Sequence, residues 1–132
     1  MKKLIFAFYL FALIACNKTD EKKIVKNLQK YYDIETPDTT GTGQIIYRFD
    51  CKKYSYSTYK FIYDDPFVME PKIKGAVDRA MESLPIATKE KSMLKVYEWE
   101  NLQTKVLMEN HFKTAYDTPV IYLHVKIWIT KK

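Results

Sequence analysis

The pattern of apolar and polar positions changes twice along this chain. One continuous apolar run occupies residues 4–14 and follows two lysines. Apolar side chains then recur at helical spacing among polar ones, at Ile24, Leu28, Tyr31 and Tyr32. Further on, the period becomes two, which is typical of strands with one buried face. The run, the helical period and the alternation therefore predict three different kinds of segment.

The first helix is expected after a short polar tether at residues 17–23. Thr19 is a favourable N-cap, and Asp20 and Glu21 suit a first helical turn. The helix should end before residues 37–43, which are rich in Thr, Asp and Gly.

Two strands and a second helix are predicted next. Alternation over residues 44–50 predicts a strand, and residues 54–63 its antiparallel partner after a turn at 50–53. The aromatics of this second strand change parity near Ser57, which predicts a β-bulge. Pro71 suits the first turn of a helix. A stripe of four apolar residues follows at helical spacing and Pro85 closes the element; the stripe is Ile73, Val77, Ala80 and Leu84.

The last third of the chain predicts three strands, at residues 93–99, 103–112 and 120–129, after a solvated connector at 89–91. One long helix over residues 91–112 is the alternative, but its apolar residues scatter around a helical wheel. The final strand has the clearest alternation. Its apolar face is expected to hold Ile121, Leu123, Val125, Ile127 and Ile129, and its other face Tyr122, His124, Lys126 and Trp128.

These elements predict one α+β domain over residues 24–132. Two helices would pack on a curved antiparallel sheet of about five strands, in the order α-β-β-α-β-β-β. Cystatin-like and NTF2-like sheets have this general look, although no residue motif supports either name.

The apolar run ends in Leu13-Ile14-Ala15-Cys16, which resembles the lipobox of bacterial lipoproteins. An ordinary secretory signal would favour an Ala-x-Ala site, which is not present there. The resemblance implies that residues 1–15 are a signal peptide, and that residues 16–23 comprise the lipidated Cys16 and the tether. In that family the cysteine receives a diacylglyceryl group and the new amino terminus is acylated, as with palmitate. The chains would anchor the protein without a transmembrane helix.

The resemblance also implies a location in the cell envelope, outside the cytoplasm. Asn17 stands where an aspartate typically retains such lipoproteins at an inner membrane, so the outer membrane is favoured in a bacterium with two membranes. The whole chain has a net charge of +6; removal of residues 1–15 takes away two lysines and leaves +4. This excess suits weak attraction to anionic lipid. The compartment argues against a nucleic-acid partner.

No motif for catalysis, for a cofactor or for a metal site is found. With three glycines in the chain there is no phosphate-binding loop, and there is no Gly-x-Ser-x-Gly or His-Glu-x-x-His. Cys51 would be the only free thiol, and Lys52 and Lys53 beside it would lower its pKa. A lone thiol without a partner histidine nevertheless predicts no role, and His124 is expected to be a polar residue on the wet side of the sheet.

The aromatic residues are the remaining candidates for a site. Strand alternation cannot bury all of them, and exposed tyrosine and tryptophan favour binding surfaces. The predicted binding residues are Tyr54, Tyr56, Tyr122 and Trp128. The leading hypothesis is a non-catalytic envelope binding module of accessory, inhibitor or immunity type, whose partner is an envelope protein or a glycan. The alternative is a small-ligand-binding or enzymatic domain with a pocket between sheet and helices.

Overall fold

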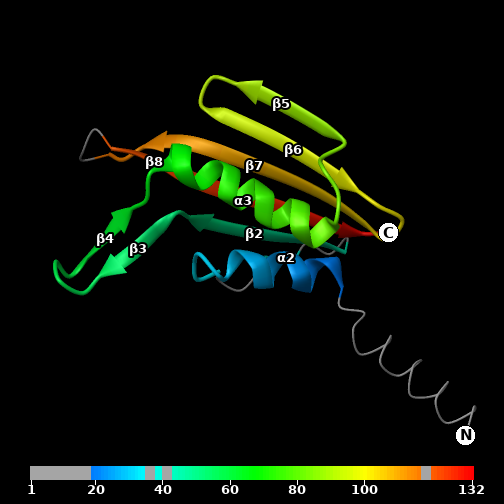
Figure 1. Cartoon of the computed structure of the whole chain (residues 1–132), viewed down its shortest axis with the longest axis horizontal. Helices are drawn as coiled ribbons and strands as arrows, with labels where there is room; N and C mark the ends of the chain where they lie inside the picture. The colour runs from blue at the N-terminus through cyan, green and yellow to red at the C-terminus, as the bar shows by residue number, and fades with distance from the viewer. Residues whose placement is uncertain (1–18, 35–37, 40–42, 117–119) are drawn as a thin grey trace, which may run out of the picture.

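The computed structural model describes residues 19–34, 38–39, 43–116 and 120–132; the predicted signal peptide and Cys16 lie outside these residues. It confirms the α+β class, with two helices against an antiparallel sheet (Figure 1). The elements in chain order are α2 (Asp20–Leu28), β1 (Asp38–Thr39), β2 (Gln44–Asp50), β3 (Lys52–Ser55), β4 (Lys60–Tyr63), α3 (Pro66–Met81), β5 (Ala87–Lys91), β6 (Leu94–Glu100), β7 (Thr104–Thr114) and β8 (Ile121–Lys131).

The main sheet has the strand order β1-β2-β8-β7-β6-β5, and β3 and β4 form a separate hairpin. The predicted pairing of residues 44–50 with 54–63 is therefore wrong. β2 pairs with β8 instead, with Ile45 opposite Ile129, and the chain bends away from the sheet at Cys51. This pairing lets β2 bury apolar side chains beside the central strand. The change of aromatic parity comes from the hairpin turn, where Tyr59 has a φ of 55°, and not from a bulge.

Helix α2 begins as its sequence predicts. The backbone N–H of Lys22 donates to the Thr19 hydroxyl at 3.4 Å, and Ile24 and Leu28 are buried. Because the helix starts at Asp20, the predicted tether at residues 17–23 is helical in its second half.

Helix α3 starts earlier than expected. Asp65 caps it by accepting a hydrogen bond from the Phe67 N–H at 2.9 Å, so Pro66, and not Pro71, occupies the first turn. Three residues of the predicted stripe are buried, whereas Leu84 lies beyond the helix and is exposed.

The predicted connector at residues 89–91 is part of strand β5, which pairs with β6. All five residues of β5 are exposed, so their side chains show no apolar alternation that would predict a strand. Lysines on an edge strand discourage pairing with another chain. Strand β6 pairs along its whole length with residues 105–111 of β7, which excludes the alternative of one long helix.

The core lies between the two helices and one face of the sheet. Four residues of β8 are fully buried there, as the alternation predicts: Leu123, Val125, Ile127 and Ile129. Ile121, at the start of the strand, is exposed. Trp99 is also fully buried, and its indole N–H donates to Asp78 Oδ1 at 2.9 Å.

The domain has two distinct ends (Figure 1). The N-terminal end gathers the start of α2, the end of α3, the β6–β7 turn and the C-terminus. The hairpin end gathers β3 and β4, the start of β8 and the start of α3. Strand β8 runs between them, and its eleven residues span about 33 Å. In the described part of the chain, no helix is long and apolar enough to cross a membrane.

Candidate functional site

A cleft of about 850 Å³ opens at the hairpin end, between the end of α2, strand β2 and the hairpin. We call it the aromatic cleft. Its aromatic lining comprises Tyr31, Tyr32, Phe49, Tyr54, Tyr56 and Phe61, and its charged lining includes Arg48, Lys52, Lys53, Asp33 and Asp50.

The hairpin supplies the exposed aromatic wall of the cleft. Cross-strand pairing places Tyr54 opposite Phe61, with ring centroids 5.2 Å apart. Tyr56 meets Tyr54 edge to face at 5.1 Å, and its side chain is 82% exposed. The Lys52 ammonium lies 4.8 Å from the centre of the Phe61 ring. The wall therefore presents aromatic rings beside a cation, a combination that suits binding of a polar partner with some apolar surface.

Tyr32 forms the floor of the cleft. Its buried hydroxyl donates to Asp64 Oδ2 at 2.5 Å, and Lys53 lies 4.0 Å from the same carboxylate. Burial, followed by the hydrogen bond to Asp64, raises the pKa of Tyr32 far above its ordinary value. Tyr32 is thus a fixed, neutral donor that joins the end of α2 to the base of the hairpin.

A histidine and a carboxylate meet at the rim of the cleft. His124 Nδ1 lies 2.6 Å from Asp50 Oδ1, because β2 and β8 place these two residues opposite each other. His111 is the cross-strand neighbour of His124 and contacts Glu109 Oε1 at 2.9 Å. A histidine oriented by a carboxylate is part of many catalytic sites, but such a site also needs a nucleophile or a bound water.

Cys51 does not provide that nucleophile. It is fully buried at the bend after β2, and burial raises the pKa of its thiol to about 12, which the hydrogen bond with Tyr32 only partly offsets. The expectation that Lys52 and Lys53 would lower this pKa is therefore wrong: burial dominates, and the nearby charges that act on the thiol are the carboxylates of Asp64 and Asp50, which raise its pKa further. The interpretation of Cys51 as a thiol without a role stays a prediction; its burial and raised pKa argue against a nucleophile.

We expect Cys51 to resist alkylation in the folded protein. At about pH 8 roughly one thiol in ten thousand would be ionised, and the side chain is out of contact with solvent. The measurement is iodoacetamide labelling of the Cys16→Ser chain with and without denaturant. Leu102→Cys in the same chain provides an exposed control thiol. Rapid labelling of Cys51 in the native chain would contradict its assigned burial.

The four predicted binding residues lie in three places. Tyr54 and Tyr56 share the aromatic cleft. Tyr122 stacks on Tyr63 of the hairpin with centroids 4.3 Å apart, so it adjoins the hairpin outside the cleft lining. Trp128 lies on the sheet face away from the helices, where Lys126 sits 5.4 Å from its ring. It is six residues, or about 20 Å, from Tyr122 along β8.

The sequence pattern did not identify Tyr31, Tyr32 and Phe61 as cleft residues. The first two were assigned to the buried stripe of the first helix, and Phe61 to a strand of the main sheet. The sequence predicts a turn at residues 50–53, but it does not predict that the strands after the bend at Cys51 leave the main sheet, and the cleft depends on that departure.

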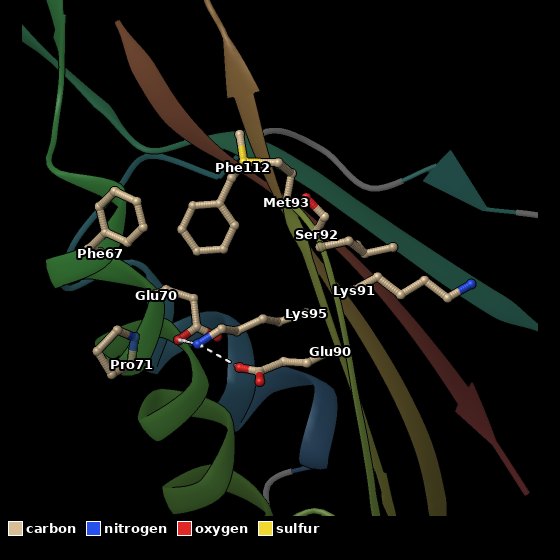
Figure 2. A pocket seen from close by; sticks show the side chains of 10 residues that line it. Phe67, Glu70, Pro71, Glu90, Lys91, Ser92, Met93, Lys95 and Phe112 are labelled. Carbon is tan, nitrogen blue, oxygen red and sulfur yellow. Dashed lines mark ion pairs between the residues drawn. The ribbon is translucent and has the colours of Figure 1, made fainter.

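A second pocket of about 510 Å³, which we call the Glu70 pocket, lies between α3 and the β5–β6 turn (Figure 2). Phe67 and Phe112 stack at 5.3 Å in its wall. The Lys95 ammonium lies between two carboxylates, 3.1 Å from Glu90 and 3.8 Å from Glu70. The hydrogen bond with Glu90 raises the pKa of Lys95, so the lysine is charged.

Glu70 itself belongs to a buried network beneath the pocket. Its Oε1 accepts hydrogen bonds from the Tyr97 hydroxyl at 2.5 Å and from Asn110 Nδ2 at 3.2 Å. All three residues are buried, and Asn110 Oδ1 has no hydrogen-bond partner. Burial and the bond to Glu70 raise the pKa of Tyr97 far above its ordinary value. The network thus joins α3 to β6 and β7 through a neutral tyrosine donor.

In comparisons with known proteins, no family model, curated protein or solved structure matches this chain. Among the described residues, no group of three or more histidine, cysteine, aspartate or glutamate side chains is arranged to hold a metal ion. The features of this protein that bear on its function are the aromatic cleft, the Glu70 pocket and the N-terminal sequence.

Proposed function

We propose that this protein is a bacterial envelope lipoprotein, anchored through Cys16, whose domain is a non-catalytic binding module for an envelope protein or glycan. The observation that most strongly supports a binding module is the aromatic cleft. Its wall exposes Tyr54, Tyr56 and Phe61 on a hairpin that projects from the main sheet (Figure 1). Exposed neighbouring aromatics are costly for a soluble domain unless a partner covers them.

The composition of the cleft supports binding more than catalysis. Aromatic rings bury a large area with few rotatable bonds, and Lys52 and Lys53 add cations at the same wall. The only thiol among the described residues is buried and has a raised pKa. The cleft thus combines recognition groups without an activated thiol.

The anchor is tested by Cys16→Ser. Without the thiol, no diacylglyceryl group can be attached, so the chain should leave the membrane fraction or persist as an uncleaved precursor. Fractionation and mass measurement of the mature chain check this result. A processed Cys16→Ser product that remains in the membrane would contradict the lipoprotein assignment.

The cleft is tested by affinity capture from solubilised envelope with the lipidated full-length chain as bait. Tyr54→Ala or Tyr56→Ala should reduce recovery of a specific partner by about 30-fold, which corresponds to 2 kcal/mol at a binding hot spot. Tyr59→Ala is the matched control, because Tyr59 is a comparably exposed tyrosine (79%) of the same hairpin and does not line the cleft. Equal recovery with all three variants would contradict the role of the cleft.

A second candidate function is binding of a small ligand in the Glu70 pocket. The supporting observation is the convergence of Glu70, Glu90 and Lys95 beside the stacked rings of Phe67 and Phe112. Polar groups that converge in a partly apolar hollow favour a ligand site. Binding that is lost on Lys95→Ala and insensitive to Tyr54→Ala would favour this candidate over the first.

A further inference from the structure

The distance between the proposed anchor and the folded domain is very short. Only Asn17 and Lys18 separate Cys16 from Thr19, the residue that caps α2. Three steps along an extended chain span at most about 11 Å. A lipid on Cys16 would therefore hold the start of α2 close to the headgroups of the bilayer.

The start of α2 is fixed to the rest of the domain and cannot act as an extension of the tether. Asp20 Oδ2 accepts a hydrogen bond from Asn101 Nδ2 at 3.0 Å. Glu21 accepts one from the buried Tyr47 at 2.7 Å and lies 3.8 Å from Lys131. These contacts join α2 to β2, β8 and the β6–β7 turn. The position of the anchor therefore sets the orientation of the whole domain.

The surface at this end suits contact with lipid. Leu102, in the β6–β7 turn, is 96% exposed, and Leu84 and Ile86, between α3 and β5, are exposed at the same end (Figure 1). Four exposed lysines lie on the chain segments that meet at this end: Lys22, Lys105, Lys131 and Lys132. Two of them pair with acids, Lys131 with Glu21 and Lys132 with Glu100 at 2.9 Å. Apolar side chains that enter the interface beside lysines that face headgroups are typical of membrane-contacting surfaces.

We propose that the N-terminal end of the domain rests on the lipid surface, with Leu102 in the interface and the aromatic cleft facing away from the membrane. This inference depends on the proposed lipidation of Cys16. The intrinsic contact can be weak, because the anchor confines the domain near the bilayer and raises its effective concentration there. Strand β8 then holds the hairpin end about 33 Å from the lipid-facing end.

The test uses the full-length lipidated chain in vesicles of phosphatidylcholine and phosphatidylglycerol that contain lipids spin-labelled at the headgroup. A bimane probe is attached to Leu102→Cys in one sample and to Tyr59→Cys, at the hairpin end, in another. Both positions are exposed, whereas Cys51 is buried and has a raised pKa, so each variant offers one reactive thiol once Cys16 carries lipid. The Leu102 probe should lose most of its fluorescence, and the Tyr59 probe should keep it.

The possible failures of this experiment have different meanings. If the chain floats with the vesicles and both probes are quenched equally, or neither is, the anchor is retained and the proposed orientation is wrong. Stronger quenching at Tyr59 than at Leu102 would show the reverse orientation and also overturn the inference. If the chain from cells carries no lipid and does not float, the anchor itself is refuted, and the orientation with it.

Discussion

Val125→Asp is expected to unfold the domain. Val125 is fully buried on the core face of β8, the strand that pairs with both β2 and β7. A carboxylate there would be separated from water, so the cost should reach about 4–5 kcal/mol or more, a large part of the stability of an ordinary domain. Circular dichroism and urea denaturation of the purified chain measure this loss.

The neighbouring position provides the control. Lys126 lies on the opposite face of the same strand, so Lys126→Asn should change the free energy of unfolding by no more than about 1 kcal/mol. Asparagine is preferable to aspartate because Glu109 lies directly opposite Lys126, and a second acid would add like-charge repulsion. If the Val125 and Lys126 variants were equally destabilised, the assignment of Val125 to the core face of β8 and of Lys126 to the opposite face would be wrong.

The second large effect is expected from Glu70→Ala. Truncation removes the acceptor of the Tyr97 hydroxyl and of Asn110 Nδ2, and both donors would remain buried without a partner. Each unpaired group is costly, and the lost methylenes leave a void, so the free energy of unfolding should fall by about 3 kcal/mol. Thermal and urea denaturation of the purified chain check this value.

Glu70→Gln is the matched control, because its amide oxygen can still accept from Tyr97 and Asn110. It loses the ion pair with Lys95, whose side chain is about one-third exposed, so solvent screening limits that loss to about 1 kcal/mol. Equal destabilisation by the two variants would show that charge, and not the hydrogen-bond acceptor, is what the network requires from Glu70.

Local patterns predicted the faces and several ends of the elements. Thr19 caps α2 because its hydroxyl, three residues before a free N–H, satisfies that donor whatever the rest of the chain does. The core face of β8 follows from its strict alternation, since a shift of one residue would bury its polar side chains. The sequence predicts Pro71 in the first turn of the second helix, but the helix begins at Pro66, five residues earlier.

The pairing of the strands and the composition of the cleft required the tertiary structure. Residues 44–50 and 54–63 are neighbours in sequence, so a hairpin between them was the natural expectation. β2 instead pairs with β8, some 80 residues away, since that arrangement buries β2 beside the centre of the sheet. Because β2 pairs with β8, strands β3 and β4 pair only with each other and form a hairpin outside the main sheet.

The sequence by itself determined the α+β class, the buried face of β8, the capped start of α2 and the lipobox-like segment, because each depends on residues a few positions apart. The tertiary structure decided which residues form the aromatic cleft, why Cys51 has a raised pKa and how Glu70 is paired. These features depend on burial and on contacts between distant segments. Burial can reverse what a sequence neighbour implies: two lysines adjoin Cys51, yet desolvation and the carboxylates of Asp64 and Asp50 raise the pKa of its thiol.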